Sequence, residues 1–358
     1  MATSSEPGEW LKWRESGRTE RQQKKKGGIT LSKHTYKLPF PNIPMMEQEI
    51  IDAIDDGNLL LFIGAGVSKL KGYPLWFELG QKLAQIAVDE QLISISEKEV
   101  LLGGNFTPMQ VVTILSKKFD EREPGAGMAK VVDELSINVT VDEKVALQLA
   151  QYLASYNSTI VTTNADDSLE GQTPLDGRMV LTNFRDYDHK FDKYSIIHLH
   201  GSVNNPGGMV FTSEQYARSY NVEDTFGEKL KELLNKDWTI LFIGYGITEF
   251  ELLRYFFKFK NDKARRMFML EGYLAKDRIK YEFDKEYYES LGIYLLPYSR
   301  EHDDYKALIK VLKRWDKDVK TKTLAGSSAK VDAIDSMTSQ LPFKESVEAI
   351  NKLVNKHG

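Results

Sequence analysis

The sequence has 358 residues, a length that favours two domains or one large domain with an insertion. Hydrophobic residues make up 41% and charged residues 28%, which excludes collagen-like and wholly disordered chains. There is no cysteine, so disulfides, thiol nucleophiles and cysteine-ligated zinc are excluded. No apolar run approaches a membrane span and no secretory signal is visible, so we expect a cytoplasmic protein. The net charge of −4 gives no sign of nucleic-acid binding.

Residues 1–40 are expected to form a flexible basic arm. Residues 1–28 carry a net charge of +3, and the run RQQKKKGG lacks apolar periodicity. A solvated tail is the simpler interpretation, because chain termini are commonly mobile. An arm that contacts phosphates or a partner is the alternative.

Alternating strands and helices over residues 41–318 predict an α/β fold with a doubly wound, Rossmann-like, mostly parallel sheet. The apolar run 59–63 ends in a glycine turn, which is typical of a strand buried on both faces. Further strands are expected in STIVTTNADD, RMVLTN, YSIIHLHGS, GMVFTS, TILFIGYG, RRMFMLEGYL and GIYLLP. Helices are expected in MMEQEIIDAIDD, GEKLKELLNKDW, ITEFELLRYFFKF, KEYYES and HDDYKALIKVLKRW.

Two segments depart from this alternation. Residues 75–156 contain four helical patterns in a row, too many for one crossover, so we expect a helical insertion that caps the sheet. Residues 319–358 are expected to form a linker followed by a short amphipathic helix, whose apolar face comprises Val347, Ile350, Leu353 and Val354.

A glycine turn follows the first predicted strand. Phosphates bind at such turns in doubly wound folds, because small residues let the backbone amides approach the anion. The residues concerned are Gly64, Ala65, Gly66 and Ser68. Lys69 stands where the third glycine of a GxGxxG motif would be, so a purely structural turn is an equal alternative.

Polar residues follow the second long strand, where side chains face the ligand crevice. Thr163 and Asn164 lie there, and the Asn164 amide can hold a ribose hydroxyl or a water. Asp166 is a candidate for fixing the ribose or the loop. Asp166 and Asp167 could instead cap a following helix, and we favour that interpretation for Asp167.

Two histidines occur in the sequence HLHGS. Residues two apart in a strand share a face, so His198 and His200 are expected to point the same way. His200 adjoins the glycine and is the better candidate base, because imidazole titrates near neutral pH. His198 is expected to support the site or the core. A metal pair is geometrically possible, but no acidic cluster with metal-like spacing accompanies it.

A second glycine turn, Gly244 to Glu249, follows the strand TILFI. It repeats the pattern of strand, small residues and helix start. Glu249 could accept from a ribose hydroxyl or cap the helix, and Tyr245 could line the crevice or belong to the core.

In order and spacing, these four motifs resemble the sirtuin family in its bacterial sirtuin-like branch, over roughly residues 45–315. GAGVS resembles the first glycine loop, TTNAD the T-x-N-x-D motif, LHGS the catalytic histidine step and FIGYGITE the later ribose-binding turn. The segment after GAGVS lacks the arginine of protein-deacylating sirtuins, and their four zinc cysteines are absent. The resemblance therefore argues against an acyl-lysine groove and a zinc module.

The resemblance implies NAD⁺ as substrate, no further cofactor and no metal. In this branch the machinery commonly destroys NAD⁺ during phage infection, so we expect a glycohydrolase that releases nicotinamide and ADP-ribose. Asn164 and His200 would be catalytic. The turn residues named above, with Thr163, Asp166, Gly244, Tyr245 and Glu249, would bind the nucleotide.

A non-catalytic NAD⁺- or ADP-ribose-binding subunit of an ATPase complex is the alternative. A protein deacylase or ADP-ribosyl transferase is less favoured. Because no sensor is visible, the resemblance further implies a homo-oligomer that docks a HerA-type ring ATPase.

Overall fold

The computed structural model describes residues 39–221, 225–246, 250–256 and 266–338. Nearly all of the expected basic arm and the whole C-terminal amphipathic segment lie outside these residues. No helix in the described ranges combines the length and apolarity needed to cross a bilayer.

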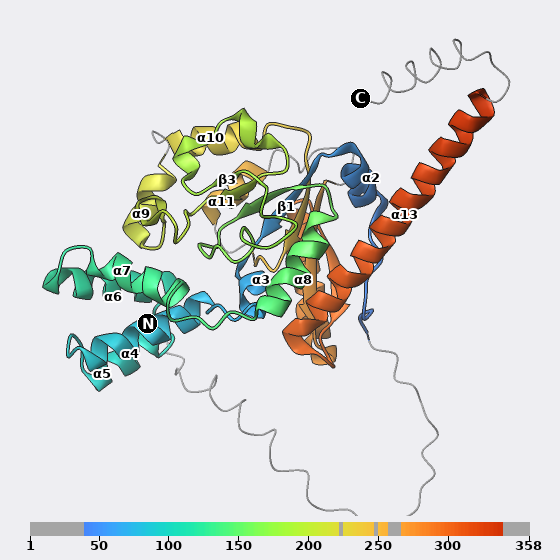
Figure 1. The fold of residues 1–358 in the computed structure, drawn as a ribbon. Coiled ribbons are helices and arrows are strands. Elements are labelled where there is room, and N and C mark those ends of the chain that lie inside the picture. The colour runs from blue at the N-terminus through green and yellow to red at the C-terminus, as the bar shows by residue number, and fades with distance from the viewer. Residues whose placement is uncertain (1–38, 222–224, 247–249, 257–265, 339–358) are drawn as a thin grey trace, which may run out of the picture. The chain divides into compact units, whose positions relative to one another are not determined.

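Seven parallel strands form one sheet in the order β3-β4-β2-β1-β5-β6-β7 (Figure 1). The first strand therefore lies near the centre, with later strands added on both sides, as expected for a doubly wound sheet. Its register is set by pairs such as Phe62 with Val161 and Phe62 with Phe242. The strands are β1 (Leu59–Ile63), β2 (Thr159–Thr162), β3 (Val180–Leu181), β4 (Ile196–His198), β5 (Thr239–Ile243), β6 (Met267–Tyr273) and β7 (Ile293–Ser299).

Helices connect the strands and cover both faces of the sheet. The α-helices of the described residues are α2 (Gln48–Asp56), α3 (Ala65–Leu70), α4 (Trp76–Asp89), α5 (Ile95–Leu102), α6 (Pro108–Arg122), α7 (Ala126–Leu135), α8 (Glu143–Ala154), α9 (Ser213–Ser219), α10 (Thr225–Leu233), α11 (Phe250–Phe256), α12 (Arg278–Ser290) and α13 (Ala307–Thr338). Short 3₁₀ turns include η1 (Phe184–Asp186) and η2 (His189–Asp192).

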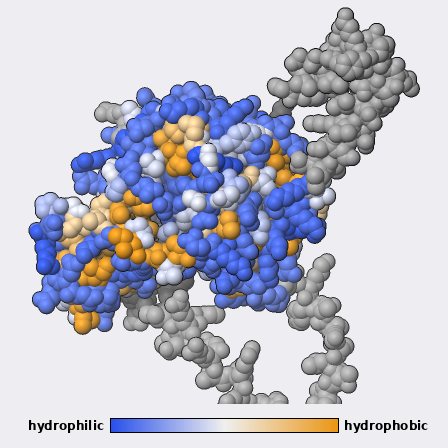
Figure 2. All heavy atoms as spheres, viewed as in Figure 1, coloured by the Kyte–Doolittle hydropathy of each residue, from blue (hydrophilic) through white to orange (hydrophobic). Residues whose placement is uncertain are grey.

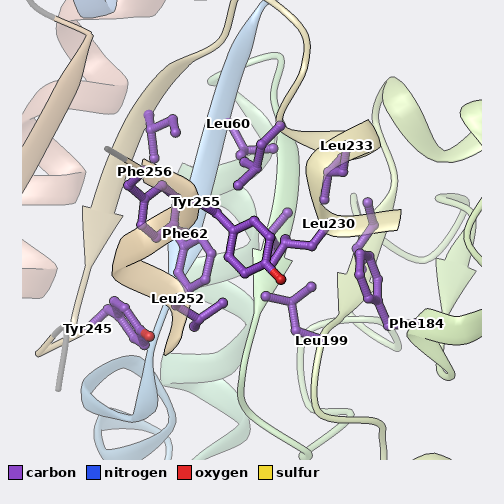
Figure 3. Packing of buried hydrophobic residues seen from close by; sticks show 14 of the residues in the cluster. Leu60, Phe62, Phe184, Leu199, Leu230, Leu233, Tyr245, Leu252, Tyr255 and Phe256 are labelled. Atoms are coloured by element: carbon purple, nitrogen blue, oxygen red, sulfur yellow. The ribbon is translucent and has the colours of Figure 1, made fainter. Parts of the chain in front are cut away.

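Alternate strand residues face two separate cores. Leu60 and Phe62 pack with α10 and α11, for example against Leu230 and Phe256 (Figure 3). Leu59, Leu61 and Ile63 pack on the other face with α2, α8 and α13. Because both faces are covered, β1 and β5 are buried along their whole length, which explains their uninterrupted apolar sequences.

The predicted helical insertion divides between two environments. Helices α4 to α7 form a third core of their own, which also includes Ala165 and Phe211 from loops beside the sheet. Helix α8 instead packs on the sheet through residues such as Leu149 and Leu153. Apolar side chains also gather on the surface formed by α4 to α7 (Figure 2), where Ile95 and Val100 are exposed.

Two sequence-based expectations differ from the structure. The segment predicted as a linker after residue 319 continues α13, which runs from Ala307 to Thr338 without a break. This stretch contains no proline, and one glycine costs a helix only about 1 kcal/mol. GMVFTS is not a strand, because after a single backbone hydrogen bond from Val210 to His200 the chain enters the capping box of α9 at Thr212.

Candidate active site

Three glycines bring the ends of β1 and β5 into backbone contact. Gly66 donates its N–H to the Gly244 carbonyl (2.9 Å), and Gly64 donates to Ile243 (3.0 Å). A Cβ atom would lie 2.5 Å from the Gly244 oxygen if placed on Gly64, and 2.9 Å from the Gly244 Cα if placed on Gly66. Gly244 itself has φ +61°, a conformation that favours glycine. These glycines therefore close the backbone junction between the two turns.

Ala65 has a different environment from the glycines beside it. Val67 donates its N–H to Gly64, so the amides of residues 64, 66 and 67 are all used within the protein. The Ala65 N–H has no acceptor among the described residues, and Ala65 lies at the carboxyl end of β1. It is therefore the amide of this turn that remains available to a ligand.

The Asn164 side chain is held in one orientation by the main chain. Its Nδ2 donates to the Gly64 carbonyl (2.9 Å), and its backbone N–H donates to Thr162 Oγ1 (3.0 Å). Thr162 Oγ1 in turn donates to the Ile63 carbonyl (2.9 Å). With Nδ2 engaged, Oδ1 is left as an acceptor without a partner in the described residues.

A buried ion pair lies beside Asn164. Lys71 Nζ is 2.9 Å from Asp166 Oδ1, and the side chains are 1% and 4% exposed. The hydroxyls of Ser68 and Ser168 also donate to the Asp166 carboxylate. Burial raises the pKa of Asp166, but Lys71 and the two hydroxyls outweigh burial, so its pKa lies below the usual value. Asp166 is therefore ionised and already fully paired.

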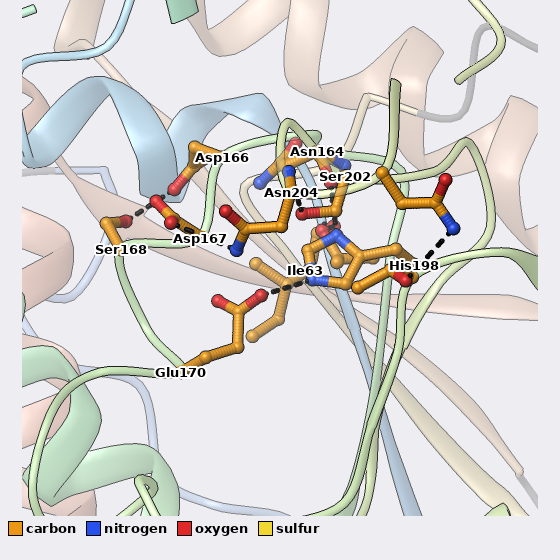
Figure 4. Close-up of polar contacts among 12 residues, drawn as sticks. Ile63, Asn164, Asp166, Asp167, Ser168, Glu170, His198, Ser202 and Asn204 are labelled. Atoms are coloured by element: carbon orange, nitrogen blue, oxygen red, sulfur yellow. Dashed lines mark hydrogen bonds and ion pairs between the residues drawn. The ribbon is translucent and has the colours of Figure 1, made fainter. Parts of the chain in front are cut away.

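His198 contacts both the Asn164 main chain and Glu170 (Figure 4). Its Nδ1 lies 2.8 Å from the Asn164 carbonyl oxygen, and its Nε2 lies 2.7 Å from Glu170 Oε1. Burial lowers the pKa of His198, but the Glu170 carboxylate outweighs it, and the pKa is raised above its usual value. Because both neighbours are acceptors, the imidazolium form satisfies both contacts at once.

His200 lies in a different environment. Strand β4 ends at His198, and the two histidines contact different residues, so the expectation that they share a face is wrong. His200 Nε2 is 2.9 Å from the Tyr220 hydroxyl, and its ring meets that of Tyr216 edge to face at 5.2 Å. Burial lowers its pKa to about 3. In this conformation His200 is neutral and enclosed by aromatic rings.

Two cavity lobes lie over the carboxyl ends of the central strands. The inner lobe, about 40 Å³, is lined by Ser68, Tyr73, Asn164, Asp166 and other residues. The outer lobe, about 300 Å³, is lined by residues that include Gly66, Gly244, Tyr245, Glu271 and Arg300. Ala65, Trp76 and Thr163 line both lobes, so the two are adjacent. An elongated ligand could therefore contact both lobes across Ala65.

The sequence of this chain is similar to those of known proteins. A SIR2-like domain model matches residues 158–295, from just before β2 into β7. The chain is thus similar to SIR2-like domains over these residues. It is also 23% identical over 245 residues to defense-associated sirtuin 2 of Bacillus subtilis. That alignment covers 66% of this chain but only 23% of the relative. The resemblance to the bacterial sirtuin-like branch is thereby confirmed.

The structure brings most of the predicted site residues to one crevice. All predicted nucleotide-binding residues within the described ranges lie at the ends of β1, β2 and β5: Gly64, Ala65, Gly66, Ser68, Thr163, Asp166, Gly244 and Tyr245. Asn164 joins them, whereas His200 lines neither lobe. Glu249 lies outside the described residues. Asp167 caps no helix and instead accepts from Asn204.

Several residues around the crevice were not predicted. Lys71 is indistinguishable in sequence from a surface lysine, and Glu170 lies in a turn without a recognisable pattern. Glu271 did carry a signal, because it is a charged residue directly after the apolar run MFML. In the described residues no group of three or more acidic or histidine side chains could hold a metal.

Proposed function

We propose that this chain binds NAD⁺ across the two lobes and hydrolyses the bond between nicotinamide and ribose. The nicotinamide end would lie toward the inner lobe and the adenosine end in the outer lobe, with the pyrophosphate passing the free Ala65 amide. By resemblance to a defence-associated relative, the proposed role is depletion of NAD⁺ in antiphage defence.

The observation that carries this proposal is the fixed Asn164 side chain. Its Nδ2 donates to the Gly64 carbonyl, its main-chain carbonyl contacts His198, and the residue lines the inner lobe. These contacts leave the side chain little freedom to turn, and Oδ1 is its remaining acceptor. A positioned acceptor of this kind can hold a water or a ribose hydroxyl without reorganisation during the reaction.

The chemistry requires little acid catalysis, because the departing nicotinamide ring is already cationic in NAD⁺. Bond cleavage leaves a ribose oxocarbenium-like centre, and a water attacks it to give ADP-ribose, neutral nicotinamide and one proton. Asn164 Oδ1 would orient that water. Asp166 would contribute negative charge near the developing cation while remaining paired with Lys71.

One observation favours a second function, the non-catalytic binding of NAD⁺ or ADP-ribose. His200 is enclosed by Tyr216 and Tyr220, and its pKa of about 3 leaves it a poor proton acceptor in this conformation. A role for His200 as base requires that these tyrosines move. A regulatory binding module needs no such movement.

Release of nicotinamide from NAD⁺ by the purified full chain distinguishes the two functions. We expect Asn164→Ala to lower turnover by about 10²–10³-fold, the usual effect of removing a positioning group. Asn235→Ala is the matched control, because Asn235 is exposed after α10 and lines neither lobe. Wild-type turnover in a folded Asn164→Ala protein would refute the assignment of this residue. NAD⁺ binding without any release by the wild type would favour the regulatory function.

A homo-oligomer that docks a HerA-type ATPase stays a prediction from resemblance. Light scattering coupled to size exclusion tests self-association of the full chain, and a strict monomer at micromolar concentration would contradict it. Co-purification with a purified HerA-type ATPase tests docking.

A further inference from the structure

Helix α9 lies beside α6 of the helical insertion and also contacts His200 (Figure 1). The Tyr220 hydroxyl is 2.9 Å from His200 Nε2, and the Tyr216 ring meets the imidazole edge to face. His200 is only 1% exposed. The two tyrosines of α9 therefore help to keep this histidine covered.

The first turn of α9 is hydrogen-bonded to α6. The Thr113 hydroxyl donates its proton to the Met109 carbonyl (2.7 Å), so it acts toward Ser213 as an acceptor. It accepts the Ser213 N–H (2.9 Å), and the Ser213 hydroxyl, 3.1 Å away, donates to it as well. Two hydrogen bonds between these residues therefore hold α9 against the insertion.

A second contact, between aromatic rings, involves the residue two positions before Ser213. The centre of the Trp76 ring, at the start of α4, is 4.9 Å from that of the Phe211 ring. The Gln215 side chain of α9 accepts the Phe211 N–H (2.9 Å), which couples the position of Phe211 to α9. The ring contact and the hydrogen bonds between Thr113 and Ser213 together form what we call the latch.

The inner lobe is too small for nicotinamide while the latch is closed. Its volume is about 40 Å³, whereas an apolar cavity that accommodates benzene measures about 150 Å³. Buried hydrogen bonds and an ion pair fix the side of the lobe formed by Asn164 and Asp166. Trp76 and Phe211 line the lobe as well, so the aromatic side is the one that can move to admit the ring.

We propose that the insertion helices α4 to α7 are a lid, and that the latch must open before the site can cleave NAD⁺. The lid is attached through two adjacent segments, 71–75 and 136–142, where the Asp142 N–H donates to the Lys71 carbonyl (2.8 Å). Such a pair of segments can serve as a hinge. Opening enlarges the inner lobe and frees the first turn of α9, so that its tyrosines can leave His200. The inference rests on the proposed function and names how the same site is regulated.

A disulfide across the latch tests the inference, because the full chain has no cysteine of its own. In Thr113→Cys/Ser213→Cys, sulfur atoms replace two oxygen atoms that are 3.1 Å apart, so a disulfide can form with little adjustment. We expect the oxidised variant to release nicotinamide at least about 10-fold more slowly than the same protein after reduction. The two single-cysteine variants are the controls, and oxidation should leave their rates unchanged.

Deuterium exchange at the imidazole C2 of His200, followed by mass spectrometry, measures opening without a ligand. Exchange should be slower in the oxidised variant than in the reduced one, whereas the exposed His302 should not change. Thr113→Val removes the acceptor of both latch hydrogen bonds, so His200 should exchange about 10-fold faster than in wild type. Thr321→Val is the matched control, because Thr321 donates to the Lys317 carbonyl within α13 in the same way that Thr113 donates to Met109.

The outcomes for the inference and for the proposed function are distinguishable. Equal nicotinamide release before and after reduction of the confirmed disulfide would overturn the inference and leave the proposed function intact. Equal His200 exchange in wild type and in folded Thr113→Val would also overturn it. Because this exchange requires no NAD⁺, it decides the inference even if the wild type cleaves no NAD⁺, a result that would refute the proposed function alone.

Discussion

Replacement of Lys71 by methionine tests the buried ion pair beside the inner lobe. The substitution keeps the length of the side chain but leaves the Asp166 carboxylate buried without its cation. Removing one partner of a buried pair costs about 3–5 kcal/mol, because the remaining charge is uncompensated. The Ser68 and Ser168 hydroxyls still donate to Asp166, so we expect a loss near the lower limit, about 3 kcal/mol.

The free energy of unfolding in urea at pH 7 measures this loss. Lys69→Met is the matched control, because Lys69 pairs with Glu78 at the surface, where both side chains are about one-third exposed. Such pairs contribute about 0–1 kcal/mol. The double variant Lys71→Met/Asp166→Asn should recover part of the stability, since it removes the unpaired charge.

The loss should also depend on pH. In wild type the depressed pKa of Asp166 contributes stability above its unfolded value of about 3.9, and this stability is lost as pH falls through the folded pKa. Without Lys71 burial dominates, so the folded pKa rises and a penalty develops as pH increases. The difference in free energy of unfolding between wild type and Lys71→Met should therefore be largest at neutral pH and should decrease toward pH 4. A loss below 1 kcal/mol at pH 7, or one equal to that of Lys69→Met, would refute the reasoning.

Three further substitutions test other contacts of the site. His198→Gln should lower kcat for NAD⁺ hydrolysis about 10-fold with little change in KM. In wild type, activity should fall as His198 loses its proton above its raised pKa, and the variant should lack this fall. A variant with the same pH profile as wild type would contradict a positioning role for His198. Tyr220→Phe removes the hydroxyl bonded to His200, so nicotinamide release should increase if that contact restrains a catalytic His200, and equal or slower release would argue against it. Gly66→Val should lower the melting temperature, because its Cβ would meet the Gly244 backbone at a cost of about 1–3 kcal/mol. If NAD⁺ binding weakened while the melting temperature stayed the same, the glycine would be needed only to let the ligand approach the backbone.

The sequence by itself determined the sheet and the place of the crevice. Uninterrupted apolar runs such as 59–63 indicate strands covered on both faces, and polar or glycine residues directly after them mark the carboxyl ends where ligands bind. These signals are local: each depends on residues within a few positions of one another. They were sufficient to place Asn164 and the two glycine turns at the carboxyl ends of β1, β2 and β5.

Only the tertiary structure decided how the individual side chains are used. Lys71 and Asp166 are 95 residues apart in the sequence, and His198 and Glu170 are 28 residues apart. Neither pair could therefore be predicted from the spacing of neighbouring residues. His200 contacts different residues from His198, although the sequence predicted that both share a face. Side chains alternate regularly only within a strand, and β4 ends at His198. The glycines 64, 66 and 244 close a backbone junction because two turns from distant strands meet there, a contact set by sheet order alone.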